Sequence, residues 1–324
     1  MFFISKTMAN LLPSKWKFKL FLSLCLTVAV LWVLVKFVGS KELVAAFNVL
    51  DLKYALMALL LALISPFISA LRWHWVLRAT GQKIGILNCM ILTMGAWPLN
   101  IFLPSRTGDF FRVAFVGKKN SKSMVFGSIV AEKILDVSCL ALIGLLGAVA
   151  IKSKTFAIVF IGLLVLVALL NQGLWLFEKL FKERKGPLLD KANLVIQATN
   201  ILSSCPKYAA VAGGFSSIKW FFPVVQALLF FKAFGIHIPL IEIAARLPLS
   251  IFAGILPITL AGVGTRDAAM IFFFKAFAPA SVILGVAILY SLYSYFLYAT
   301  LGIPFFIYLI THSSNHKDEE NCST

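Results

Sequence analysis

The chain has 324 residues, of which 60% are hydrophobic and only 13% are charged, and its mean hydropathy is +0.94. Soluble domains are usually about half apolar and about a quarter charged, so this composition excludes a soluble globular protein and predicts a polytopic membrane protein. The net charge of +17 would also suit a nucleic-acid-binding protein. Because cytoplasmic loops of membrane proteins gather Lys and Arg, we expect no nucleic-acid partner.

The first predicted element is a transmembrane helix over residues 18–38. Lysines between residues 6 and 19 lead into an apolar run that is longer than the apolar core of a typical signal peptide. No small-x-small cleavage site follows, which favours a retained first helix over a cleaved leader. We therefore predict a basic cytoplasmic N-terminus over 1–17, one transmembrane domain over 18–310 and a disordered tail over 311–324.

A second helix is predicted over residues 54–76, and it runs into the sequence LRWHWVLRATGQ. This stretch combines Arg72, Trp73, Trp75 and Arg78 at the end of an apolar helix. Aromatic and basic residues commonly gather where a membrane helix meets water. We therefore expect these four residues to anchor the helix end at the interface, in preference to contacting a ligand.

The next apolar segment, residues 86–103, is short and contains proline. It continues into NIFLPSRTGDFFR, whose polar, proline and glycine residues include Asn100, Pro104, Arg106, Gly108, Asp109 and Arg112. If the segment crossed the membrane completely, the basic loop over 106–122 would lie outside the cell, against the positive-inside rule. We therefore predict a re-entrant segment that enters and leaves on the cytoplasmic side.

A full transmembrane helix is predicted over residues 124–150, although this helix contains Glu132 and Asp136. The two acids are four residues apart and therefore share one helix face. Charged side chains inside a membrane usually face the interior of the bundle and take part in function. The predicted cationic partners are Arg106, Arg112 or Arg266. The alternative is a structural salt bridge that only fixes helix packing.

Helices over residues 155–177 and 208–231 precede a second interrupted segment, residues 243–260. The sequence GILPITLAGVGTRDAA repeats the order of the first break: a Leu-Pro pair, a glycine, then arginine and aspartate close together. The residues that carry this repeat are Pro257, Gly262, Gly264, Arg266 and Asp267. A short amphipathic helix over 267–278 and a last helix over 281–310 follow.

The glycines before Arg266 admit two interpretations. If AGVGTRD opens a helix near Arg266, free backbone N–H groups would point at an anion. A simple re-entrant turn explains these glycines equally well. Lys219 and Lys275 also lie in apolar surroundings, and we expect their side chains to extend to the interface.

The two interrupted segments together predict an inverted repeat. Residues 86–103 would enter from the cytoplasmic side, 243–260 from the outer side, and the C-terminus would return to the cytoplasm. Such pairs meet near the bilayer midplane in many transporters, and non-helical backbone at that depth must be buried in protein or line a wet cavity. We therefore predict an all-α polytopic bundle of about six full spans and two re-entrant segments that line a polar cavity. The alternative is an ordinary loop after a full span at each break.

No metal, cofactor or catalytic site is predicted. The five cysteines and four histidines are scattered without ligand-like spacing, which supports neither a disulfide framework nor a zinc site. The sequence contains no nucleophile elbow, P-loop, HExxH or acyltransferase signature. We expect a protein without a cofactor and without catalysis of the kind found in soluble enzymes.

The motifs taken together resemble a known family. NIFLPSRTGDFFRVAFV, VAEKILDV and LPITLAGVGTRDAA, in this order and spacing, resemble the lysylphosphatidylglycerol synthase transmembrane-region family, also called flippase-like or UPF0104-type membrane proteins. The resemblance runs from about Phe18 to Tyr308. It implies central roles for Asn100, Pro104, Arg106, Gly108, Asp109, Arg112, Glu132, Asp136, Pro257, Gly262, Gly264, Arg266 and Asp267. This chain departs from the family pattern at Asp267, where glutamate is expected, and at Ala261, where glycine is expected.

The resemblance also implies what the protein does. Two-domain members of that family make aminoacylated phosphatidylglycerol with a soluble domain, and their membrane region is associated with moving the lipid between leaflets. This chain resembles the membrane region alone, so aminoacyl transfer is not implied. The leading hypothesis is a lipid translocase of the plasma or inner membrane that acts on a phospholipid or a lipid-linked intermediate.

The hypothesis assigns a role to each singled-out residue. Guanidinium groups can hold a phosphate in bidentate fashion, so we expect the arginines to bind the headgroup phosphate and the carboxylates to meet an amine or a proton. The predicted substrate-binding residues are Arg106, Arg112, Arg266, Glu132, Asp136, Asn100, Asp109 and Asp267. The predicted hinges or turns are Pro104, Gly108, Pro257, Gly262 and Gly264.

Two other classes of function stay open. One is a membrane partner or subunit of a lipid-modifying transferase, and the other is a small-solute or ion transporter. The expected partners are membrane lipids, an enzyme of lipid biosynthesis and a second copy of the chain.

Overall fold

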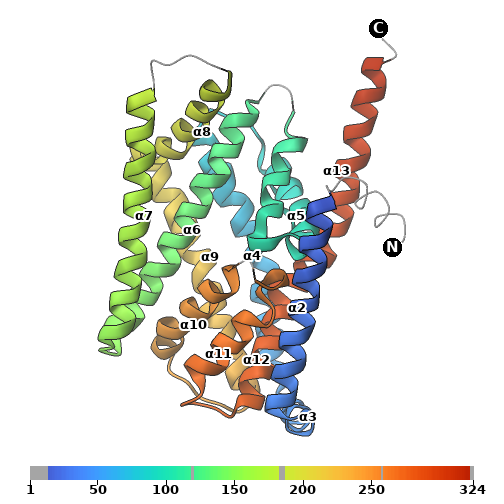
Figure 1. Cartoon of the computed structure of the whole chain (residues 1–324), viewed down its shortest axis with the longest axis vertical. Helices are drawn as coiled ribbons and strands as arrows, with labels where there is room; N and C mark the ends of the chain where they lie inside the picture. The colour runs from blue at the N-terminus through green and yellow to red at the C-terminus, as the bar shows by residue number, and fades with distance from the viewer. Residues whose placement is uncertain (1–13, 118–119, 182–186, 257, 322–324) are drawn as a thin grey trace.

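The computed structural model describes residues 14–117, 120–181, 187–256 and 258–321, and this part of the chain is helical without strands (Figure 1). The predicted all-α class is confirmed, and the predicted terminal boundaries at residues 17 and 310 stay predictions. The elements are α2 (Ser14–Val38), α3 (Ser40–Asn48), α4 (Leu52–Ala79), α5 (Ile86–Phe102), η1 (Pro104–Phe115), α6 (Lys122–Ala150), α7 (Lys154–Phe181), α8 (Pro187–Ser204), α9 (Pro206–Ala233), α10 (Leu240–Ile255), η2 (Leu260–Gly262), α11 (Thr265–Phe274), α12 (Ala280–Ser291), η3 (Leu292–Phe296) and α13 (Leu297–Asn321).

Five helices of the described chain are long and apolar enough to cross a membrane, among them Ala280–His312, which runs through α12, η3 and α13. The pair α2–α3, bent by 78°, is a sixth candidate. The bend falls at Gly39, whose φ of +89° lies in the region that favours glycine. The structure therefore confirms a multi-pass membrane protein with about six spans.

The first interrupted segment folds back on itself as a hairpin. α5 ends at Phe102, Leu103 is extended with φ −97° and ψ 135°, and η1 then packs against α5. The two arms are closest at Gly108, where a Cβ atom would lie 2.8 Å from the backbone nitrogen of Asn100 and 2.9 Å from the carbonyl carbon of Leu99. A larger residue at this position would push η1 away from α5, so glycine fixes the hairpin.

The second interrupted segment is a hairpin of α10 and α11, with η2 at its turn. Ala261 and Gly262 have φ values of +51° and +73°, in the left-handed region. A Cβ atom on Gly262 would lie 2.4 Å from the carbonyl oxygen of Gly254, so the turn has no room for a side chain there. The left-handed backbone at Ala261 gives the physical reason why the family resemblance favours glycine at this position.

The two hairpins enter from opposite ends of the bundle and meet inside it. Figure 1 shows α5 in the upper half of the molecule, and α10 and α11 in the lower half. η1 contacts η2 and α10, and α5 also contacts η2. The breaks predicted from the sequence therefore converge, in agreement with the predicted inverted arrangement.

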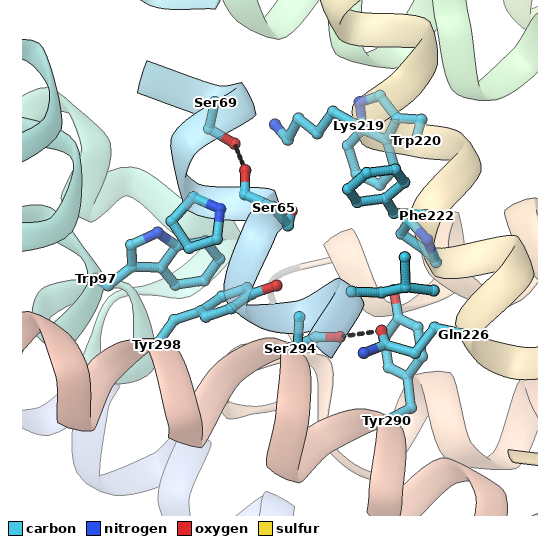
Figure 2. Close-up of a pocket in the computed structure, with 14 residues that line it drawn as sticks. Ser65, Ser69, Trp97, Lys219, Trp220, Phe222, Gln226, Tyr290, Ser294 and Tyr298 are labelled. Atoms are coloured by element: carbon cyan, nitrogen blue, oxygen red, sulfur yellow. Dashed lines mark hydrogen bonds between the residues drawn. The ribbon is translucent and has the colours of Figure 1, made fainter. Parts of the chain in front are cut away.

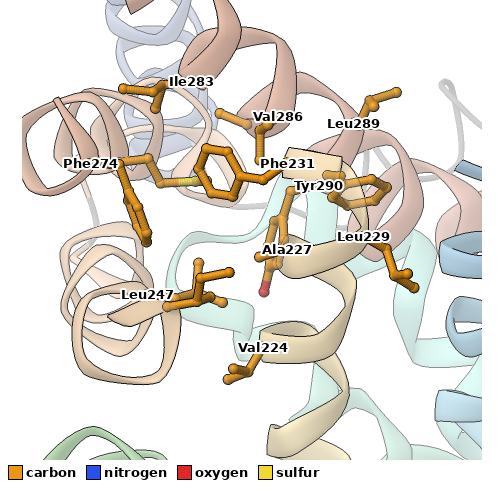
Figure 3. Close-up of a cluster of buried hydrophobic side chains, with 14 of the residues drawn as sticks. Val224, Ala227, Leu229, Phe231, Leu247, Phe274, Ile283, Val286, Leu289 and Tyr290 are labelled. Atoms are coloured by element: carbon orange, nitrogen blue, oxygen red, sulfur yellow. The ribbon is translucent and has the colours of Figure 1, made fainter. Parts of the chain in front are cut away.

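The largest apolar core holds the second hairpin against α9 and α12 (Figure 3). Phe231 on α9 and Phe274 on α11 are fully buried, and their ring centroids are 5.1 Å apart. Leu247 on α10 and Val286 on α12 belong to the same core and are also fully buried. This packing fixes α11, and with it the turn before α11, relative to α9.

The polar interval between residues 178 and 207 contains a helix that hydropathy did not predict. α8 packs against α6 and α7, and it buries Ile196, Ala198 and Thr199. Thr199 Oγ1 donates to the carbonyl oxygen of Val195 at 2.9 Å, which satisfies the hydroxyl inside the helix. Because only one face of α8 is buried, the average hydropathy of the interval does not reveal it.

Candidate functional site

A buried ion-pair network joins α4, η1, α6 and α9. Its centre is Arg72 on α4, which is fully buried and whose two terminal nitrogens donate to Glu132 and Asp136. The two carboxylates lie one helical turn apart on α6, and a flat guanidinium with several N–H groups can span both. The prediction that Glu132 and Asp136 share one buried face is confirmed.

Asp136 receives further donors from α9. Lys219 Nζ lies 3.0 Å from Asp136 Oδ2, and Trp220 Nε1 donates to Asp136 Oδ1 at 2.6 Å. Arg72 also donates to Ser216 Oγ at 3.3 Å, which joins α4 directly to α9. Asp136 thus accepts hydrogen bonds from two cations and an indole N–H.

The first hairpin is tied to the network through η1. Arg112 Nη2 lies 3.0 Å from Glu132 Oε2. Asp109 accepts a hydrogen bond from Asn100 Nδ2 at 2.9 Å and forms an ion pair with Lys133 on α6. Two ion pairs therefore hold η1 against α6: η1 supplies the cation in one (Arg112) and the anion in the other (Asp109).

The network carries one more positive than negative charge among its described members. Its cations are Arg72, Arg112, Lys133 and Lys219, and its anions are Asp109, Glu132 and Asp136. Arg72 Nε and Arg112 Nη1 are also buried without a hydrogen-bond partner within the described ranges. Buried polar groups are usually satisfied, so the excess charge and the two unpartnered nitrogens suit water or an anion.

A second buried ion pair lies in the second hairpin. Arg266 Nη2 lies 2.9 Å from Asp267 Oδ1 and also donates to Ser291 Oγ on α12. Asp267 Oδ2 accepts the backbone N–H of Gly264 at 2.9 Å, directly before the start of α11. The carboxylate of Asp267 therefore occupies the helix N-terminus at which one interpretation of the sequence placed an external anion.

A polar pocket lies between the network and this second pair (Figure 2). Its cavity volume is about 40 Å³, and it is partly open to the outside. The wall includes Lys219, which is bound to Asp136 of the network. The wall also includes Tyr290, whose ring centre lies 4.8 Å from the guanidinium carbon of Arg266. The pocket therefore borders both groups of buried charges.

Two prolines lie inside the helices that line this pocket. Pro66 in α4 and Pro223 in α9 are both on the pocket wall. Proline has no N–H group, so the carbonyls four residues earlier, those of Ala62 and Lys219, lack their usual helical donor. Ala62 and Lys219 line the pocket as well.

The structure brings most of the predicted substrate residues into one place. The members of the network that the sequence predicted are Asn100, Asp109, Arg112, Glu132 and Asp136. Of the arginines predicted to pair with the two acids of α6, Arg112 pairs with Glu132, whereas Arg266 pairs with its neighbour Asp267. Gly108 lies within η1 where this segment contacts α5, and Gly262 and Gly264 lie in the turn before α11. Pro257 and the side chains of Pro104 and Arg106 lie outside the described part of the structure.

The expectation that Arg72 and Trp73 anchor a helix end at the interface is wrong. Both side chains are fully buried, and Trp73 Nε1 donates to Ser128 Oγ at 3.1 Å. The guanidinium of Arg112 also lies 4.4 Å from the centre of the Trp73 ring. The two acids of α6 were the sequence signal that could have predicted a buried position for Arg72, because two carboxylates inside a membrane require nearby cations.

The expectation for Lys219 is also wrong. Only 13% of its side chain is exposed, and its ammonium is bound to Asp136, whereas an interfacial lysine would extend to water. Pocket residues such as Ser65, Ser69, Gln226 and Ser294 were not predicted at all. Single polar residues in an apolar helix are common and do not by themselves indicate a pocket. The local signal for the pocket was the proline inside each of α4 and α9.

Comparison with known proteins places this architecture in a family. The family model described as "Lysylphosphatidylglycerol synthase TM region" matches residues 20–302. A UPF0104 membrane protein of Methanocaldococcus jannaschii is 25% identical over 296 residues, which cover 82% of this chain and 88% of that protein. A UPF0104 membrane protein of Methanothermobacter thermautotrophicus is 24% identical over 314 residues, which cover 86% of this chain and 93% of that protein. The chain therefore belongs to the lysylphosphatidylglycerol synthase TM-region family.

Proposed function

We propose that the protein moves the polar headgroup of a phospholipid, or of a lipid-linked intermediate, from one membrane leaflet to the other. The headgroup would cross through the pocket between α4 and α9 while the acyl chains stay in the surrounding lipid. The observation that carries the proposal is a polar pocket, bordered by buried ion pairs, beside two broken hairpins that meet inside an apolar bundle. Charged groups and helix breaks inside a membrane are costly and commonly mark a substrate pathway.

The predicted substrate residues receive roles that follow from their contacts. Arg112 Nη1 and Arg266 Nη1 are buried and without a hydrogen-bond partner among the described residues. A phosphate in transit would satisfy such an N–H group, and we propose the same role for Arg106, which belongs to the same segment of the sequence. The carboxylates of Glu132 and Asp136 are engaged by cations, which supports a role in positioning those cations.

Headgroup translocation in proteoliposomes tests the proposal. Vesicles would contain phospholipids with a headgroup fluorophore, and a membrane-impermeant reductant would be added from outside. We expect bleaching of the outer leaflet alone in protein-free vesicles, and of both leaflets in vesicles with the protein. A cleavable tag at residue 1 would report orientation, and we propose that this end faces the cytoplasm because of its lysines.

A pair of acid substitutions gives the matched control. Asp136→Asn is expected to slow translocation by about tenfold or more, because charge-assisted hydrogen bonds contribute on the order of 1.5–3 kcal/mol. Glu42→Gln changes an exposed acid on α3 and is expected to leave the rate unchanged. Bleaching equal to that of protein-free vesicles, across a broad panel of headgroups, would contradict the proposal. Uptake of a small anion by the same vesicles without lipid movement would favour a solute transporter instead.

A further inference from the structure

The pocket between α4 and α9 has to widen before a headgroup can pass through it. Its cavity volume of about 40 Å³ holds only a few water molecules. A phosphodiester with its attached group is larger than that, so the proposed function requires a second, open conformation of the protein. The element that changes between the two conformations should lie in the pocket wall and contact both hairpins.

The π-helical turn η3, which joins α12 to α13, lies in this wall. The backbone N–H of Leu297 donates to the carbonyl oxygen of Leu292, five residues earlier, so η3 holds one residue more than an α-helical turn would. Such turns are rare and occur frequently at functional sites. Ser294, inside η3, lines the pocket and donates to Gln226 Oε1 on α9 at 3.3 Å (Figure 2). The extra residue is therefore part of the pocket wall.

The extra residue lets two tyrosines flank one buried guanidinium. The guanidinium carbon of Arg266 lies 4.8 Å from the ring centre of Tyr290 and 5.0 Å from that of Tyr295. All three side chains are buried. In an α-helix, residues five positions apart point about 140° away from each other, because each residue turns the helix by about 100°. The π-helical turn therefore places both rings on the same side of the helix, against Arg266.

Tyr295 connects η3 to the first hairpin as well. Its ring centre lies 6.5 Å from that of Trp97 on α5, and Trp97 also packs against Tyr298 on α13, with ring centres 4.7 Å apart. Arg266, at the start of α11, belongs to the second hairpin. One side chain of η3 thus contacts both hairpins, and a change in the turn alters both contacts.

We infer that η3 is the gate of the pocket, and that the pocket opens when the extra residue moves along the helix toward Pro304. The inference rests on the proposed function, because the passage of a headgroup is what requires an opening. Pro304 already interrupts the hydrogen bonds inside α13, so a π-helical turn costs less there than in an intact helix. Only the residues between the old and the new position rotate, by about 100°, and these include Ser294, Tyr295 and Tyr298. The rotation breaks the hydrogen bond of Ser294 to α9 and takes Tyr295 away from the second hairpin.

Arg266 keeps a counter-ion when Tyr295 rotates away. Its Nη2 lies 2.9 Å from Asp267 Oδ1, a contact within the second hairpin that does not involve η3. The gate therefore exchanges one cation–π contact and one hydrogen bond without isolating a buried charge, and such a small difference allows two conformations of similar free energy.

Deletion of Leu292 tests the gate. The deletion removes the extra residue and leaves a continuous α-helix, in which Tyr295 follows Tyr290 by four positions and stays on the side of Arg266. The pocket would then be held closed. The reporter is a thiol on the pocket wall, Ser65→Cys, in the purified full-length protein. We expect its labelling by a charged methanethiosulfonate reagent to slow by about tenfold or more, because the labelling rate follows the open fraction.

Leu292→Ala is the matched control for the deletion. The side chain of Leu292 is 45% exposed, and the substitution removes most of it while keeping the extra residue in the turn. We expect the labelling rate of Ser65→Cys to stay within about twofold of that with unmodified η3. Thermal unfolding of the deletion variant in detergent shows whether the variant is folded, and equal labelling with and without Leu292 in folded protein would overturn the inference.

Tyr295→Leu shifts the gate in the opposite direction and does not depend on the deletion variant being folded. The substitution removes one of the two rings that hold Arg266 in the closed conformation, so we expect labelling of Ser65→Cys to rise by about threefold or more. Tyr295→Phe keeps the ring and is expected to label more slowly than Tyr295→Leu. No rise in Tyr295→Leu would contradict a gate at η3.

Failure of the gate and failure of the proposed function give different results. Labelling that depends on η3, without movement of lipid between leaflets by the unmodified protein, would overturn the proposed function and leave the gate intact. Translocation by the deletion variant at the rate of the unmodified protein would overturn the gate and support the proposed function.

Discussion

Replacing Arg72 with methionine is expected to destabilise the protein strongly and to abolish lipid translocation. Arg72 is the shared partner of Glu132 and Asp136, and all three side chains are buried. Removal of one member of a buried ion pair typically costs about 3–5 kcal/mol, because the remaining charge stays buried without compensation. The measurement is thermal unfolding of the purified protein in detergent, followed by the proteoliposome assay on any variant that folds.

Arg78→Met provides the matched control for this substitution. Arg78 lies on the same helix but is exposed, so its replacement is expected to change stability by less than about 0.5 kcal/mol. Arg72→Lys keeps the charge but not the flat group that spans two carboxylates, and an intermediate loss is expected. Unfolding of Arg72→Met at the same temperature as Arg78→Met would show that the network does not hold the helices together.

Asp267→Asn is expected to loosen the second hairpin. The carboxylate of Asp267 caps α11 at Gly264 and is the counter-ion of Arg266, which has no solvent exposure. The neutral amide would leave the guanidinium buried without its charge partner, at a cost of about 3–5 kcal/mol. Faster hydrogen exchange over residues 260–274, compared with the unmodified protein, is the expected result.

Glu242→Gln is the control for the second hairpin because it breaks a different ion pair on α10. The side chains of Glu242 and Arg246 are 23% and 17% exposed, and their pair spans one helical turn. Partly exposed pairs of this kind contribute less than about 1 kcal/mol, so little change is expected. Equal hydrogen exchange in the two variants would contradict a structural role for the Asp267 carboxylate.

Much of the fold follows from local properties of the sequence. Hydropathy predicts the long helices because each must cover about 30 Å of hydrocarbon. The two hairpins are also predictable, because proline and glycine interrupt an apolar run and the basic residues after the first break oppose a full crossing. At Gly108 and Gly262 the structure shows why the residue type is required, since a Cβ atom would meet backbone atoms.

The pairing of charges depends on contacts between distant segments, which local patterns do not specify. Arg72 and Asp136 are 64 residues apart, and Asp136 and Lys219 are 83 residues apart. A basic residue in a largely apolar segment fits the interface and the bundle interior equally well, so the common role at the interface was predicted for Arg72 and Lys219. The pocket is less predictable still, because its hydroxyl and amide groups become a site only when α4, α9 and α12 pack together.

Water is expected to reach the polar pocket between α4 and α9, and thiol accessibility tests this most directly. Ser65→Cys places a thiol on the pocket wall, and Leu166→Cys places one on α7, where Leu166 is 52% exposed on an apolar helix. A charged methanethiosulfonate reagent reacts with the thiolate, which forms where water is present. Site-resolved mass spectrometry separates each new thiol from the five native cysteines. We predict labelling of Ser65→Cys and none of Leu166→Cys; equal inertness of the two thiols would contradict a wet pocket.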